Sequence, residues 1–244
     1  MVATRKSLGD PNVGDPLNVS EDRVQLRKHM FSTYRSMRIG MLVIALAFPL
    51  VLWIVGGVVY GLSLQDSMSA YYWASIKEGG GPPMRVWFVG ILFALATCLF
   101  LYKGYTRLED SALNVAAVCA FLVALVPMCW KTESECPSWR KLHGGSAIVF
   151  FVLLALVSIL HALYALGWLQ GGSRRPRSKY WLWYVGTALA MVLSPIGAWI
   201  FFETYPAQTF YVEVAGIGAF CIFWGVQSWQ IHNSGFDQEL AQRE

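Results

Sequence analysis

The stretch from Ile39 to Leu62, IGMLVIALAFPLVLWIVGGVVYGL, decides the fold class of this chain because it contains no Asp, Glu, Lys or Arg. A helix advances about 1.5 Å per residue, so roughly 20 apolar residues cross the hydrocarbon core of a bilayer. The stretch is long enough to do so as a single helix. It therefore predicts an integral membrane protein.

Five further apolar segments follow this stretch at short intervals. Soluble proteins carry about 25% charged residues, whereas this chain has 14% and is 56% hydrophobic. The segments do not alternate with polar residues as the strands of a membrane β-barrel would. We therefore expect an all-α bundle of six transmembrane helices over residues 39–229, at Ile39–Leu62, Val86–Tyr102, Ala112–Trp130, Ala147–Leu169, Trp181–Phe202 and Phe210–Trp229.

The positions of the basic residues predict the direction of these helices. Loops on the cytoplasmic side of a membrane carry the excess of Lys and Arg. Of the 19 Lys and Arg residues, the ones that fall on the side away from the N-terminus are Lys77, Arg85, Lys131, Arg140 and Lys141. All others lie in the tails or in loops on the same side as the N-terminus. Both termini are therefore expected in the cytoplasm.

The N-terminal region is expected to lie outside the membrane. Residues 1–19 are rich in Gly, Pro, Asp and Asn, which predicts a disordered tail. Residues 20–38 combine apolar residues at helical spacing with basic residues, which predicts a short juxtamembrane amphipathic helix on the inner leaflet. Residues 230–244 are expected to form a cytoplasmic C-terminal tail.

The charge pattern indicates which partners to expect. The net charge is only +4, and the basic residues lie beside apolar segments. Anionic lipid headgroups are their natural counter-charge, whereas a nucleic-acid interface would need a basic, aromatic-rich soluble surface. Membrane lipids are therefore the expected partners, with protein partners or a homo-oligomer as further candidates and no nucleic acid.

Cys129 and Cys136 bracket the loop after the third expected span, and of the five cysteines only this pair could readily meet. In an oxidising compartment a disulfide between them would close a short ring. The alternative is a zinc site, but His143 is the only histidine close to them, and zinc needs more ligands than these. We assign no metal, and the disulfide is one of two interpretations.

The histidines do not favour a haem. A b-type haem in a helical bundle needs two histidines at one depth, but His143 and His161 of the fourth span lie roughly 27 Å apart along a helix axis. A retinal protein would need a Lys in the middle of a span, and none is present. No cofactor is expected.

Polar side chains gather at the ends of the spans that face away from the cytoplasm. Ionisable groups are costly near a bilayer, so they mark candidate functional sites. The candidate ligand-binding residues are Ser67, Ser69, Tyr72, Arg85, His143, Glu203 and Glu213, with Asp66 and Tyr71 beside them. Together they could supply a general base, a nucleophile or metal ligands. The alternative is structural, because charged and aromatic side chains cost least at helix ends.

Glu213 is the sharpest of these predictions, since it falls inside the sixth expected span. A carboxylate at that depth would have to meet Arg85, His143 or water to stay ionised. At the opposite end of the bundle, Asp110 is expected to cap the third helix, with Ser111 as the alternative. No catalytic residue can be assigned.

Small residues predict where the helices pack closely. Gly57 with Gly61, and Ala215 with Ala219, are spaced four apart and would present small faces to a neighbouring helix. Pro195 is expected to kink the fifth helix.

Several short motifs contain these polar residues. They are Ser67-Met-Ser69-Ala-Tyr71-Tyr72, Arg85-Val-Trp-Phe88-Val-Gly90, Tyr102-Lys-Gly-Tyr105, Asp110 with Asn114, His143-Gly144, and Glu213 ahead of Ala219-Phe220. Over about residues 64–229 the chain resembles a group of bacterial membrane proteins that carry a domain of unknown function. The resemblance implies a bacterial plasma (inner) membrane and a periplasmic outer side. It implies no activity.

The activity is open between three classes. The first is a non-enzymatic role, as a structural or accessory subunit or as a binder of a lipid or small hydrophobic ligand at the periplasmic mouth. The second is a metal-dependent hydrolase similar to the ceramidase superfamily, although the last span lacks the His-x-x-x-His pair of that superfamily. The third is a small transporter, although the two halves show no visible repeat.

Overall fold

A computed structural model describes residues 16–74, 84–104, 106–129, 136–169, 180–201 and 207–233. Every regular element among these residues is helical. The long helices are α1 (Pro16–Ile54), α2 (Arg85–Leu101), α3 (Arg107–Leu125), α4 (Lys141–Leu169), α5 (Tyr180–Phe201) and α6 (Gln208–Asn233). A short π-helix, η1 (Val55–Val59), continues α1, and two 3-10 turns, η2 (Ser69–Tyr72) and η3 (Ser138–Arg140), lie in the connections. The expected all-α class is confirmed.

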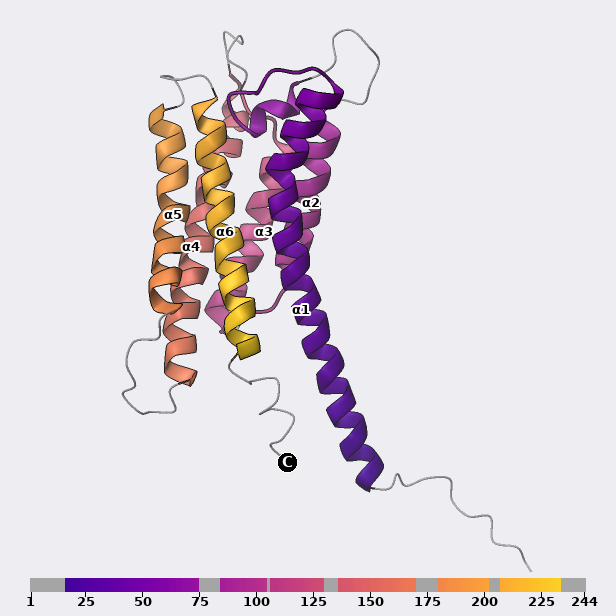
Figure 1. The fold of residues 1–244 in the computed structure, drawn as a ribbon. Helices are drawn as coiled ribbons and strands as arrows, with labels where there is room; N and C mark the ends of the chain where they lie inside the picture. The colour runs from indigo at the N-terminus through magenta and orange to yellow at the C-terminus, as the bar shows by residue number, and fades with distance from the viewer. Residues whose placement is uncertain are drawn as a thin grey trace, which may run out of the picture.

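The six long helices form a closed ring. Each helix packs against its neighbours in the chain, and α6 returns to pack against α1. Because successive helices run in opposite directions, α1 begins at the same end of the bundle at which α6 finishes (Figure 1). We call this the inner end, and the end that carries the α1–α2 connection the outer end.

Four of the helical segments are long and apolar enough to cross a membrane, namely His29–Val59, Arg107–Leu125, Ser138–Leu163 and Gln208–Gln230. The segments Arg85–Leu101 and Tyr180–Ser194 are apolar but shorter. Large apolar side chains also cover the outside of the ring, among them Val58, Leu163, Leu182 and Leu193, each at least 60% exposed. Such a surface is suited to lipid rather than to water.

The N-terminal segment differs from expectation. Residues 20–38 do not form a separate helix on the inner leaflet, because α1 runs without interruption from Pro16 to Ile54. The basic segment 20–38 adjoins the apolar segment directly, and Gly40 at this junction is tolerated inside a helix at a cost of about 1 kcal/mol. The expected tail is also shorter, since α1 starts with Pro16, a residue favoured in the first helical turn. In Figure 1, α1 extends past the other helices at the inner end.

The third span is shifted toward the N-terminus relative to the expected Ala112–Trp130. Helix α3 starts at Arg107 and ends at Leu125, where Val126 turns to an extended backbone conformation. The residue before a proline is pushed out of the helical region, and Pro127 follows. Thr106 caps the helix by accepting a hydrogen bond from the Glu109 N–H at 3.1 Å. The prediction that Asp110 or Ser111 caps this helix is therefore wrong.

The predicted small faces also have other roles. Gly61 has a φ of +63° and ends the first helix, with the Leu62 N–H bonded to the Gly56 carbonyl, as in a glycine-terminated helix. On α6, Ala215 is exposed and Gly216 makes the close approach instead, because a Cβ there would overlap the Ser194 hydroxyl of α5.

Helix α5 continues through Pro195, and the Ser194 hydroxyl donates to the Met191 carbonyl that the missing N–H leaves free.

Gly56 fits against the ring of Tyr71, which is the basis of a stability prediction. A Cβ at Gly56 would lie 2.7 Å from Tyr71 Cε1, whereas a Cβ at Gly57 would meet only the Leu62 carbonyl oxygen at 3.8 Å. We expect Gly56→Ala to lower the free energy of unfolding by about 1–3 kcal/mol through overpacking. Gly57→Ala is the matched control and should be neutral or slightly stabilising. Thermal unfolding of both purified variants in detergent checks this, and equal melting temperatures would contradict it.

Candidate functional site

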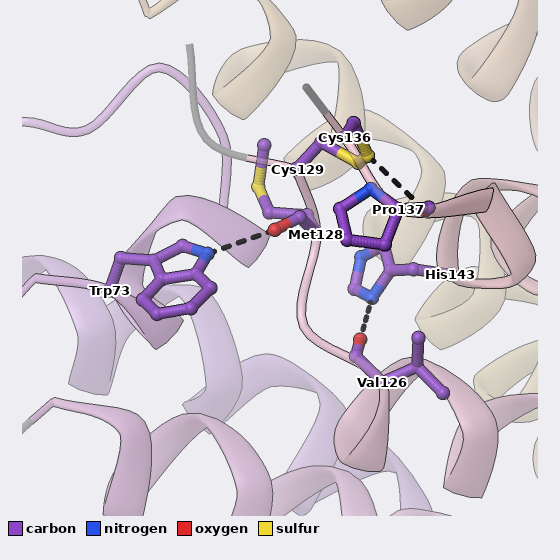
Figure 2. Close-up of a disulfide and its surroundings, with 7 residues drawn as sticks. All are labelled: Trp73, Val126, Met128, Cys129, Cys136, Pro137 and His143. Atoms are coloured by element: carbon purple, nitrogen blue, oxygen red, sulfur yellow. Dashed lines mark hydrogen bonds between the residues drawn. A yellow bond between two sulfur atoms is a disulfide. The ribbon is translucent and has the colours of Figure 1, made fainter. Parts of the chain in front are cut away.

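The connection after α1 folds back into the outer end of the ring. We call residues 61–74 the plug. The backbone of Asp66 accepts a hydrogen bond from the Phe210 N–H at 3.0 Å, and its carboxylate accepts one from the Ala207 N–H at 3.3 Å. On the other side, the Trp73 indole donates to the Met128 carbonyl at 3.0 Å (Figure 2). The plug is thus tied to the start of α6 and to the α3–α4 connection.

Two of the predicted residues, Ser69 of the plug and His143 of α4, contact each other. Nε2 of His143 lies 2.9 Å from Ser69 Oγ, and Nδ1 lies 2.6 Å from the Val126 carbonyl oxygen. Figure 2 shows the histidine ring directed at Val126 from the first turn of α4. His143 is only 6% exposed, so these contacts are shielded from bulk water.

Glu213 lies in the same region but has a different partner from any expected for it. Its Oε2 accepts a hydrogen bond from the Met68 backbone N–H at 2.6 Å. Met68 immediately precedes Ser69 in the plug, so the N–H that binds Glu213 and the hydroxyl that contacts His143 come from adjacent residues of the plug. Burying a polar group costs free energy unless it is hydrogen-bonded. The Met68 N–H therefore compensates part of the cost of holding Glu213 inside the bundle.

A cavity of about 80 Å³ lies inside the ring next to these residues. Ser69 and Glu213 are its polar lining residues, and the rest of its wall is apolar. That wall is built from α1, α2, α3, α4 and α6 by Phe48, Phe88, Leu92, Leu95, Ala120, Val123, Ala147, Phe150, Phe151 and Ile217, with Met68 of the plug. From Phe88 to Leu95 of α2 the wall extends about 10 Å toward the inner end. The cavity is therefore a narrow apolar chamber with one polar end.

The other predicted site residues do not join this chamber. Arg85 is exposed, and its guanidinium carbon lies 5.5 Å from the centre of the Tyr72 ring, in a cation–π arrangement. Ser67 accepts the Ala70 N–H at 3.1 Å and donates to Met128 Sδ at 3.7 Å, so it shapes the plug. Glu203 lies outside the described residues.

Tyr71 anchors the plug in the outer core. Its side chain is 1% exposed and its ring packs against Phe210. Burial raises the pKa of the Tyr71 hydroxyl, partly offset by a hydrogen bond with the backbone of Gln65. Tyr71 is therefore neutral, and it holds the plug by packing.

Cys129 and Cys136 are joined by a disulfide, with their Cα atoms 5.7 Å apart. The bond lies beside Met128 and above His143 in Figure 2. It links residues 126–129, whose carbonyls accept the His143 and Trp73 hydrogen bonds, to residues 136–140, which lead into α4. In this arrangement the two sulfurs bind each other rather than a zinc ion. Within the part of the chain that the structure describes, no three His, Cys, Asp or Glu side chains form a potential metal site.

A second polar cluster lies inside the ring near its inner end, and the sequence analysis did not anticipate it. Glu109 of α3 is 1% exposed and His161 of α4 is 3% exposed, and Oε1 of the first lies 3.6 Å from Nδ1 of the second. Gln227 of α6, which is fully buried, places its Nε2 at 3.2 Å from the same His161 nitrogen. The close approach of Gly104 to this turn, where a Cβ would lie 2.9 Å from Glu109 Cβ, brings the connection before α3 against the cluster.

The cluster continues into α5 and the end of α6. The Tyr184 hydroxyl donates to Gln230 Oε1 at 2.5 Å, and the Ser158 and Thr187 hydroxyls lie 3.1 Å apart. Placing the start of the third span at Ala112 left Glu109 outside the membrane and concealed this cluster. The available signal was Gln227 and Gln230, two amides three residues apart at the end of the sixth apolar segment.

Comparisons of this chain with models of protein families, with curated proteins and with solved structures found no match.

The Tyr184–Gln230 hydrogen bond allows a direct test of the inner cluster. Tyr184→Phe removes one hydroxyl, leaves Gln230 Oε1 without that donor, and should lower the free energy of unfolding by about 1–3 kcal/mol. Tyr211→Phe is the matched control, because Tyr211 is 63% exposed and should tolerate the change. Chemical unfolding of both variants in detergent micelles checks this. A loss of stability that is the same in both variants would show that the inner hydrogen bond contributes nothing specific.

Proposed function

We propose that the chain is a six-span protein of a bacterial plasma membrane, with both termini in the cytoplasm. We further propose that it binds a neutral, single-chain amphiphile in the chamber at its periplasmic end. The observation that carries the proposal is the chamber itself, which has apolar walls from five helices and polar groups only at the end formed by the plug.

The ring supports six spans rather than four. Helices α2 and α5 each pack between two neighbours of the ring, so a membrane that contains those neighbours contains α2 and α5 as well. Helix α2 has 17 residues and α5 has 22. Both lengths fall within the range of about 17–25 residues found for membrane helices.

The distribution of basic residues and the position of the disulfide support the proposed direction of the helices across the membrane. The inner end of the ring carries the tails and connections that hold most of the 19 basic residues, as expected for a cytoplasmic side. The disulfide between Cys129 and Cys136 lies at the outer end. Disulfides persist in the periplasm and are rare in the cytoplasm. The outer end is therefore assigned to the periplasm, as the family resemblance also implies.

The shape of the chamber limits the ligand to one narrow apolar chain. Pockets for drug-sized ligands measure about 300–1,000 Å³, and 80 Å³ is far below that range. A hydrocarbon chain that enters beside the plug would pass between aromatic and aliphatic side chains toward Leu95. Burial of each CH₂ group contributes about 0.8 kcal/mol relative to water.

The polar end of the chamber selects the head group. One oxygen of Glu213 accepts a hydrogen bond from the Met68 N–H, and the carboxyl group can accept a further one from a ligand hydroxyl or amide. Arg85 is exposed on the outside and does not line the chamber, so an anionic head group would meet a carboxylate with no compensating cation among the lining residues. A neutral head group with hydroxyl donors, as in a monoacylglycerol, fits these constraints best.

The topology has its own test. Reporter fusions placed at residue 1 and after residue 244 should both report the cytoplasm, and a fusion in the connection between α3 and α4 should report the periplasm. Matched fusions in the connection between α4 and α5 serve as the cytoplasmic control. Termini on opposite sides of the membrane would refute the six-span arrangement.

Binding is tested by filling the chamber. Ala120→Leu adds bulk to its wall, and we expect at least a tenfold loss of affinity for monooctanoylglycerol, whose chain matches the length of the chamber, measured by native mass spectrometry of delipidated protein. Val115→Leu on the same helix is the control, because Val115 is 50% exposed on the lipid-facing side and should bind as the unmodified protein does. Equal binding by both variants, or no binding by the unmodified protein, would overturn the proposed function.

A further inference from the structure

We propose that Ser69 is a nucleophile, activated by His143, that accepts the acyl group of a neutral single-chain ester held in the outer chamber. The site would then be an acyl-transfer site that acts without a metal ion. This inference rests on the proposed function, because the chamber must first hold the acyl chain beside Ser69.

The hydrogen bonds of His143 determine which of its nitrogens carries the proton. A backbone carbonyl can only accept, so the contact of 2.6 Å with the Val126 oxygen requires a proton on Nδ1. In the neutral ring, Nε2 is then a lone-pair acceptor, and the Ser69 hydroxyl at 2.9 Å must be the donor. This is the arrangement in which a histidine removes the proton of a serine nucleophile. The Val126 carbonyl orients the imidazole, a task that a carboxylate performs in the serine–histidine–aspartate triad.

Ser69 differs in burial and in hydrogen-bond partner from Ser67, a serine that only stabilises the fold. Its neighbour Ser67 is 3% exposed and uses its hydroxyl within the plug, on Ala70 and Met128. Ser69 is less buried than Ser67, lines the chamber, and directs its hydroxyl proton to His143. A carbonyl carbon at the head of an acyl chain in the chamber would therefore lie next to Ser69 Oγ.

The chemistry balances with the ester and water alone. Ser69 Oγ attacks the ester carbonyl while its proton moves to His143 Nε2. The carbon–oxygen bond to the alcohol then breaks, the same proton passes to the departing alkoxide, and the acyl group remains on Ser69 as an ester. A water molecule, or a second alcohol, reverses these steps on the acyl-serine and releases a fatty acid or a new ester. His143 ends each half-reaction neutral, so no further reactant is consumed.

Covalent labelling tests the nucleophile directly. The purified full-length protein in nanodiscs is treated with an alkyl fluorophosphonate, and peptide mass spectrometry locates the adduct. We expect labelling at Ser69, its loss in Ser69→Ala, and labelling at least 100-fold slower in His143→Gln, since general-base catalysis contributes about 10²–10⁴-fold. Ser63→Ala is the matched control: it lies in the same plug, it is exposed, and it should be labelled at the rate of the unmodified protein.

Binding of monooctanoylglycerol by the same samples separates this inference from the proposed function. Ser69→Ala leaves the apolar wall of the chamber unchanged, so it should still bind the amphiphile in native mass spectra while losing the label. If the unmodified protein binds the amphiphile but is not labelled at Ser69, the nucleophile is refuted and the binding function stands. A labelling rate that His143→Gln does not change refutes the role of His143 as a base. If the amphiphile does not bind at all, the proposed function itself fails.

Discussion

The lipid outside the ring is the physical constraint on which the rest of the structure depends. A polar side chain in a membrane span has no water partner on the lipid side, so it must face the interior of the ring or lie near an end. The buried polar residues of α4 obey this constraint. His143 and His161 are separated by 18 positions, which is five turns of helix, and both point inward. One face of α4 therefore supplies a histidine to each end of the ring.

Helix α6 repeats this arrangement, and the two polar sites are therefore separated by an apolar layer. Glu213 serves the outer chamber and Gln227 the inner cluster. Between them, Phe220, Phe223 and Trp224 of α6 are nearly fully buried. The outer site lines a chamber, whereas the residues of the inner one are buried and contact one another. That difference is why we propose a ligand for the outer site and a stabilising role for the inner one.

The plug converts a ring of helices into a site. Without it, Glu213 and His143 would line the mouth of the bundle from α6 and α4, with neither the Met68 N–H nor the Ser69 hydroxyl to bind. Its position depends on long-range hydrogen bonds to Phe210, Ala207 and Met128, and on the packing of Tyr71 against Gly56. The disulfide beside Met128 restrains the segment that receives one of these bonds.

By itself, the sequence determined the helical class, the approximate positions of the apolar segments and the outer position of Ser69, His143 and Glu213, because hydrophobic length and charge are local properties of the chain. Only the tertiary structure decided that Ser69 pairs with His143, that Glu213 pairs with Met68 and not Arg85, and that Glu109 meets His161 inside the ring. These contacts join residues 52 to 145 positions apart, and such pairings follow from how the helices pack and where the plug folds back. Helix ends were misplaced for a related reason, since Thr106 and Pro127 act through single local interactions that apolar periodicity does not reveal.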